Sequence, residues 1–235
     1  MNILWLSTSG APQTRFVPLN ARNQRIHVIS RATGQAKPIL KRIAILCAAE
    51  IVLAFAINAM VGAKSLVAMV NNGQRISTQI GCGVGVGAVI SVLVTALVLY
   101  VPMFSRLRGK LLDLVRPLEL GPFDPIWLSL FAGVGEEMLF RGSLQPILGL
   151  WWTSLLFACL HVTPKQYRAV DRATLVYVGA VFAGGVLLGT VFREIGLIAA
   201  MAAHATWDTV VIVWLRHYSR SPLTPLTTES QRRRA

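Results

Sequence analysis

The chain has 235 residues, of which 54% are hydrophobic and 14% are charged, and its formal net charge is +13. Soluble domains carry about 25% charged residues, so this composition argues against a soluble domain and predicts an all-α, polytopic membrane helix bundle. Nucleic acid is not the expected partner, because the positive charge collects in the tails and in short loops and forms no basic face with interleaved aromatic residues.

The N-terminal half begins with a polar, basic stretch. Residues 1–38 contain three prolines and no sustained periodicity, so they are predicted to form a poorly ordered cytoplasmic tail. Apolar segments over residues 39–62 and 80–104 are each long enough to cross a bilayer. With the polar loop between them and a basic loop after them, they form a predicted supporting part over residues 39–122.

Two features stand out in these first spans. Glu50 lies near the centre of the first one, either as an accessory group of a site or as a protonated or hydrogen-bonded packing residue. The packing interpretation is favoured, because no motif surrounds Glu50. The second span begins with glycines in two overlapping GxxxG patterns, which predict the close approach of another helix: Gly81, Gly83, Gly85 and Gly87.

Four apolar segments follow, over residues 123–149, 150–162, 173–192 and 195–215. Pro146 is expected to bend or end the first of these four, and the next is short. Gly185 and Gly189 predict a further close helix contact. Together these segments form a predicted core over residues 123–215, which precedes a basic tail over residues 216–235.

Charge predicts the orientation of this bundle of about six spans. All but four of the 23 lysines and arginines lie in the tails, at the start of the first span, or in the loops 105–122 and 163–172. The exceptions are Lys64, Arg75, Arg141 and Arg193. Because basic residues are retained on the cytoplasmic side, both termini of this multi-pass cell-membrane protein are predicted to be cytoplasmic.

Ionisable residues recur inside the core segments, where a lone charge costs several kcal/mol in lipid. They are Glu136, Glu137 and Arg141 in the third span, His161 at the end of the fourth, and His204 and Asp208 in the sixth. Residues four apart share a helix face, so the spacing predicts that Glu137 pairs with Arg141 and His204 with Asp208. If the three segments each cross the bilayer, these groups meet at one depth and form a functional site.

Carboxylates and imidazoles in an apolar site are suited to the activation of water. A desolvated carboxylate beside a histidine can take a proton from water, and a second histidine can donate to a developing oxyanion. Alternatively, Glu136, His161 and His204 could ligate a divalent ion such as zinc. The spacing does not choose between these two, although the HExxH zinc-protease pattern is absent and no cofactor is favoured.

Taken together, three motifs resemble those of the CAAX protease and bacteriocin-processing family, the Abi-type intramembrane proteases. They are Glu136-Glu137-xxx-Arg141, Phe157-xxx-His161 and His204-xxx-Asp208, in this order and each on its own apolar segment. The resemblance implies an intramembrane endopeptidase that acts on a peptide or membrane protein. It also implies that Glu136 and His161 activate water, that His204 and Asp208 stabilise the oxyanion, and that Glu137 and Arg141 orient the site.

Two alternative functions remain open at this point. A proton-coupled transporter could use the same buried carboxylates as a relay, but it would favour broken helices in paired halves, and one set of motifs is present. A non-catalytic scaffold or immunity protein could keep the fold, but its motifs should be eroded. Each motif also has a structural interpretation, as an ion pair, an interfacial histidine or a polar pair between helices.

Overall fold

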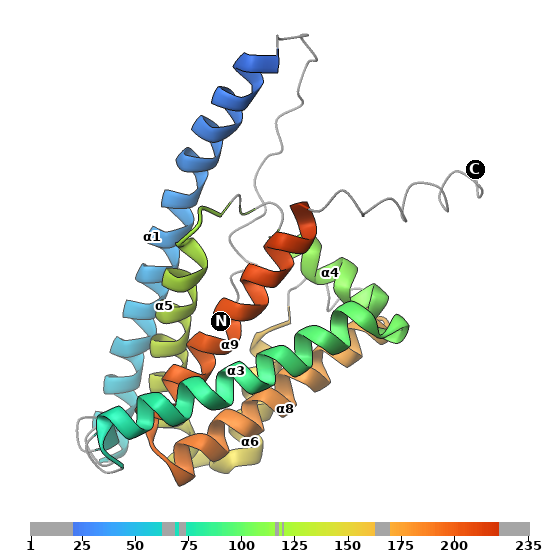
Figure 1. Ribbon diagram of the computed structural model, residues 1–235. Helices are drawn as coiled ribbons and strands as arrows, with labels where there is room; N and C mark the ends of the chain where they lie inside the picture. Colours follow the sequence, from blue (N-terminus) through green and yellow to red (C-terminus); the bar gives the residue numbers. More distant parts are fainter. Residues whose placement is uncertain are drawn as a thin grey trace.

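The computed structural model describes residues 21–62, 69–70, 74–115, 118, 120–162 and 170–220, and every regular element in these ranges is helical (Figure 1). In chain order these are α1 (Ala21–Val61), α3 (Ile76–Tyr100), the short 3-10 helix η2 (Pro102–Phe104), α4 (Ser105–Val115), α5 (Asp124–Leu139), the π-helix η4 (Phe140–Leu144), α6 (Gln145–Leu160), α8 (Arg172–Glu194) and α9 (Leu197–Arg220). The predicted all-α class is therefore confirmed.

In the part of the chain that the structure describes, five helical runs are long and apolar enough to cross a membrane: Pro38–Val61, Ile76–Tyr100, Asp124–Leu160, Arg172–Glu194 and Leu197–Ser219. The prediction of a polytopic bundle is confirmed, but the predicted third and fourth spans form one continuous run. The helix changes direction at Gly149, whose positive φ of 79° suits a residue without a side chain. The helical part after it, residues 150–160, is about 16 Å long, which is half the thickness of the hydrocarbon core.

Two stretches predicted to be irregular are helical. The helix α1 begins at Ala21, so it extends into the predicted tail 1–38 and contains Pro38 within it; residues 1–20 lie outside the described ranges. The predicted loop 105–122 contains α4, whose buried leucines Leu107 and Leu112 give it one apolar face. A period of 3.6 residues in so short a segment was hidden among the basic residues that lie between its leucines. The predicted loop 163–172 lies almost wholly outside the described residues.

Small residues set the distances between the helices. A methyl group on Gly83 or Gly87 of α3 would strike the backbone of α9, at Ala199 and Ala203 respectively. The other two glycines of the predicted pattern, Gly81 and Gly85, have nothing within 4 Å. One of the two GxxxG patterns therefore forms the contact. The predicted contact of α8 is also present, since Gly185 faces Ser154 and Gly189 faces Gln145, both on α6.

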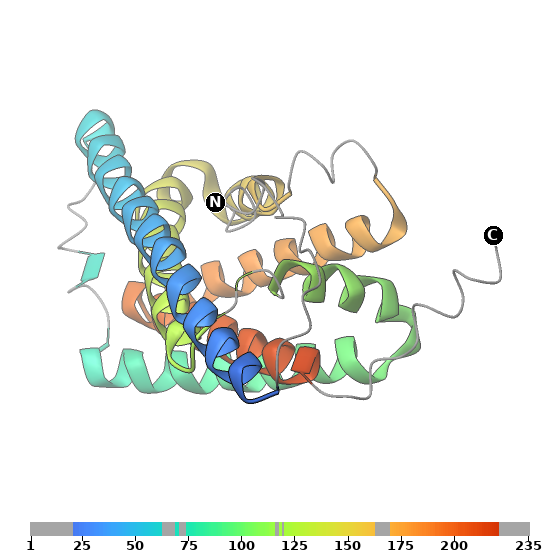
Figure 2. The same ribbon diagram turned by 90° about the horizontal axis from the view of Figure 1, so that it is seen from above.

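The helix α9 occupies the middle of the bundle. It packs against α3, α5 and α8, and Figure 2 shows it between α3 and α8. On the other side of α5 lies α1, while α6 packs along α8. This arrangement places the interior faces of α5 and α9, which carry most of the predicted site residues, against each other.

Candidate active site

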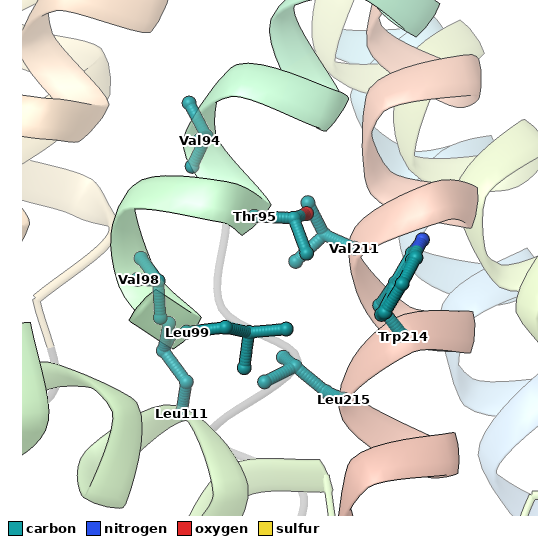
Figure 3. Close-up of a pocket in the computed structure, with 8 residues that line it drawn as sticks. All are labelled: Val94, Thr95, Val98, Leu99, Leu111, Val211, Trp214 and Leu215. Atoms are coloured by element: carbon teal, nitrogen blue, oxygen red, sulfur yellow. The ribbon is translucent and has the colours of Figure 1, made fainter. Parts of the chain in front are cut away.

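One small pocket does not contain the ionisable residues. It lies between α3, α4 and α9, and Figure 3 shows apolar side chains such as Val98, Leu111 and Trp214 around it. None of its lining residues is ionisable. The candidate site is instead a packed cluster among α5, η4, the end of α6, and α9. There, Glu136, Glu137, Arg141 and His204 are all buried.

Glu136 and His161 face each other across two segments of the chain. The His161 Nε2 atom lies 3.4 Å from Glu136 Oε2. The His161 Nδ1–H donates a hydrogen bond of 2.8 Å to the Phe157 carbonyl, one turn back on α6. Because a carbonyl only accepts, this bond places a proton on Nδ1 and leaves Nε2 as the atom that faces the carboxylate. Both atoms can therefore contact one water molecule that lies beside them.

Glu137 joins the first motif to the third. One carboxylate oxygen, Oε2, lies 3.1 Å from Arg141 Nε, so the pairing that the i,i+4 spacing predicted is present. The other, Oε1, lies 2.8 Å from His204 Nδ1, a contact between residues far apart in the chain that the spacing could not indicate. Glu137 is completely buried, and its two oxygens are directed to two different helical elements. It fixes the His204 ring with Nδ1 as a donor.

Asp208 is the most open member of the cluster. Its Oδ2 atom lies 3.5 Å from His204 Nε2, and its side chain is 35% exposed, against 7% for His204. The predicted pairing is present but loose. The 2.8 Å contact with Glu137 already places a proton on Nδ1 of His204. Asp208 is therefore not needed to set the tautomer, and the His204 Nε2 atom faces the open side of the site.

Arg141 is held by a backbone irregularity and by α8. It lies in the π-helix η4, where the wider turn rotates its side chain back toward Glu137, and π-turns are frequent at functional sites. Its Nη2 atom donates a 3.0 Å hydrogen bond to the Gly185 carbonyl of α8. Its Cζ atom lies 4.6 Å from the ring centroid of Phe157, a distance typical of a cation–π contact. The guanidinium thus has an anion, a carbonyl and a ring as partners.

Phe157 provides the apolar wall of the cluster. Its ring centroid lies 4.2 Å from that of His161, 6.1 Å from that of His204 and 5.0 Å from that of Phe140. Such a wall excludes water and lowers the local dielectric constant, which strengthens every charge interaction inside the cluster.

Two residues that sequence reasoning did not place in the site border it. Tyr177 of α8 has its hydroxyl 3.5 Å from the His161 carbonyl and is close enough to Glu136 and Asp208 to interact with both electrostatically. Glu50 of α1 is buried, and its carboxyl interacts electrostatically with Glu136 and His204. The sequence could have indicated Glu50, because a carboxylate in an apolar span is unusual. It could not have indicated Tyr177, because a tyrosine in an apolar helix is common.

The sequence left open whether Glu136, His161 and His204 hold a divalent ion. Within the described ranges, no group of three or more His, Cys, Asp and Glu side chains is spaced to hold a metal ion. Both ring nitrogens of His204 face carboxylates, and both oxygens of Glu137 face cationic or imidazole nitrogens. The mechanism proposed below therefore uses side chains and water.

A family model described as type II CAAX prenyl endopeptidase Rce1-like matches residues 119–210. Over these residues the chain resembles the Rce1-like family. The segment contains Glu136, Glu137, Arg141, His161, His204 and Asp208, so the resemblance drawn from three motifs is confirmed. The helices α1, α3 and α4 lie outside the Rce1-like segment.

The chain is also similar to the uncharacterized protein YpbD of Bacillus subtilis (strain 168). The two are 39% identical over 92 residues, which is 39% of this chain and 45% of YpbD. The match thus spans less than half of that relative's length. No solved structure matches the chain.

Proposed function

We propose that the chain is an intramembrane endopeptidase, which hydrolyses a peptide bond of a membrane-associated protein or peptide with water activated by Glu136 and His161. The observation that carries the proposal is the 3.4 Å approach of Glu136 Oε2 to His161 Nε2 inside an apolar helix bundle. It is supported by the Rce1-like match, which covers both residues. A structural ion pair alone would not explain why a second carboxylate, Glu137, pairs separately with Arg141 and His204.

In the first step, a water molecule between Glu136 and His161 gives a proton to the Glu136 carboxylate. The water oxygen forms a bond to the carbonyl carbon of the peptide, and the electron pair of the carbonyl double bond moves onto its oxygen. The hydrogen bond from His161 to the Phe157 carbonyl keeps the imidazole aimed at the water. General base catalysis of this kind contributes about 100- to 10,000-fold to a rate.

In the second step, the negative oxygen of the tetrahedral intermediate accepts a hydrogen bond from His204 Nε2, which requires His204 to carry a proton on both ring nitrogens. Glu137 holds the opposite nitrogen of that ring, and Arg141 balances the charge of Glu137. The carbon–nitrogen bond then breaks, and Glu136 returns its proton to the leaving amine. Donors fixed in advance around a developing oxyanion are usually the largest single contribution to such catalysis.

The test compares cells that express the wild-type chain with cells that express Glu136→Gln or His161→Ala. New peptide termini in membrane proteins are identified by mass spectrometry, and a synthetic peptide that spans one of them is then cleaved with purified protein. Each variant is expected to lose at least about 100-fold in cleavage rate, because each lacks one of the two groups that hold the water. Glu194→Gln, at an exposed helix end, is the control and should cleave normally. Cleavage by folded Glu136→Gln at the wild-type rate would refute the proposal.

A further inference from the structure

The helix α8 contributes no residue to the three motifs, yet one of its side chains lies near residues of all three. The Tyr177 hydroxyl lies 3.5 Å from the backbone carbonyl of His161, in the second motif. It also interacts electrostatically with Glu136 of the first motif and with Asp208 of the third. Tyr177 is therefore located where the elements of the site meet.

The Tyr177 hydroxyl is not strongly bound to its backbone neighbour. Hydrogen bonds between a hydroxyl and an oxygen are usually 2.5–3.0 Å long, so 3.5 Å is a weak contact. A phenol is neutral near pH 7 and can both donate and accept. The hydroxyl can therefore turn toward a substrate atom without the loss of a strong bond.

The open side of the cluster is the side on which Tyr177 lies. Exposure rises from Glu137, whose side chain is completely buried, through His161 to Asp208, whose side chain is 35% exposed. Tyr177 borders the two more exposed residues, His161 and Asp208. A peptide that approaches Glu136 and His161 from this side would come close to the Tyr177 hydroxyl.

His204 and Tyr177 are both neighbours of Asp208. The Nε2 atom of His204 lies 3.5 Å from the Asp208 carboxylate, and Tyr177 is close enough to that carboxylate to interact with it electrostatically. The contact of His204 with Asp208 is too long for a strong hydrogen bond, so Nε2 can turn to another acceptor. The carbonyl oxygen of a bound peptide, once it becomes negative, would find both donors in the same region.

We propose that Tyr177 is a further catalytic residue, whose hydroxyl donates a hydrogen bond to the carbonyl oxygen of the scissile peptide bond, together with His204 Nε2. The proposal rests on the proposed peptidase function and adds a donor to its second step. No proton is transferred in this contact. The O–H bond of Tyr177 stays intact, and its hydrogen bond to the peptide carbonyl oxygen strengthens as that oxygen gains negative charge. The hydrogen bond from Tyr177 weakens again when the carbonyl double bond re-forms.

The test uses Tyr177→Phe, which removes one oxygen atom and leaves the ring in place. With the synthetic peptide described above, kcat should fall about 100-fold while KM changes less than about twofold, because one oxyanion donor is worth about 100- to 1,000-fold in kcat. Tyr100→Phe on α3, where the ring is 75% exposed, is the matched control and should match the wild type. Thermal unfolding of the purified variants in detergent confirms that both remain folded.

A second measurement separates catalysis from positioning. A phosphinate analogue of the same peptide, which carries a negative oxygen on a tetrahedral centre, should bind Tyr177→Phe about 100-fold more weakly than the wild type. The uncleaved peptide, bound to Glu136→Gln with or without Tyr177→Phe, should show equal affinity. A rise in KM with unchanged kcat, or unchanged affinity for the phosphinate, would overturn the role of Tyr177. Absence of cleavage by the wild type would instead refute the peptidase function itself.

Discussion

Glu137 and Arg141 form the most deeply buried ion pair of the site, with side chains 0% and 1% exposed. A buried charge is tolerated only when it is paired and hydrogen-bonded, and each of these two residues has more than one partner. The Glu137 carboxylate pairs with Arg141 and His204. The Arg141 guanidinium pairs with Glu137 and donates a hydrogen bond to the Gly185 carbonyl. This chain of contacts ties α5, η4, α8 and α9 together, so it supports the fold as well as the chemistry.

Glu137→Gln tests this dual role at the level of one residue. The amide has nearly the same shape but no charge, so Arg141 loses its anion inside the bundle. Loss of one partner of a buried ion pair costs about 3–5 kcal/mol, and a clear drop in the thermal unfolding temperature in detergent is expected. Glu194→Gln breaks the exposed pair with Arg193 and should change stability by less than about 1 kcal/mol. Equal shifts for the two variants would contradict a structural role of Glu137.

The sequence predicted contacts between side chains that are close along the chain, and it missed contacts between distant ones. The pairs Glu137–Arg141 and His204–Asp208 are one helical turn apart, so the geometry of a single helix brings them together. The contact of Glu137 with His204 depends on how two distant helices rotate against each other, which spacing does not encode. Tyr177 was missed for the same reason, because its partners come from three other segments.

At the level of the element, the glycines of α3 show how a pattern can predict a contact without its rotation. The sequence contained two overlapping GxxxG patterns, and either could have faced another helix. In the structure Gly83 and Gly87 lie against the backbone of α9, while Gly81 and Gly85 have open space around them. The choice depends on which side of α3 meets the central helix, and that is a property of the whole bundle. The close approach brings α3 against the stretch of α9 that leads to His204.

Gly83→Ala and Gly85→Ala form a matched pair that tests this packing. A Cβ atom on residue 83 would lie 2.8 Å from the Ala202 Cβ and would also strike the Ala199 carbonyl, so the helices must separate. Overpacking of this kind costs about 1–3 kcal/mol and should lower the unfolding temperature in detergent. The same change at residue 85 meets nothing within 4 Å and should leave the unfolding temperature unchanged or slightly raised. Equal destabilisation by both variants would show that α3 packs on α9 through a different face.

At the scale of the whole molecule, the number of helices long enough to span the membrane differs from the number of times the chain passes from one side to the other. Five runs are long enough to cross, whereas the sequence predicted about six spans. In Figure 1, however, α5 and α8 both run downward along the chain, α8 at a slant, so the chain must return between them. The returning part includes the short helix 150–160, which ends at His161 inside the bundle. The end of this helix places the His161 ring 3.4 Å from Glu136, and hydropathy alone could not distinguish so short a helix from a spanning segment.

Six crossings, with one made partly by a short helix, predict that the two ends of the chain lie on the same side of the membrane. This orientation can be tested by single cysteines in a chain whose three native cysteines are replaced. The positions are Gln74, Arg106, Glu194 and His217, all of them exposed. Because the basic segments should be cytoplasmic, Gln74→Cys and Glu194→Cys should react with a membrane-impermeant maleimide in intact cells. Arg106→Cys and His217→Cys should react only after permeabilisation. Labelling of His217→Cys in intact cells, with Arg106→Cys protected, would mean an odd number of crossings between them, and the return of the chain at His161 would have to be abandoned.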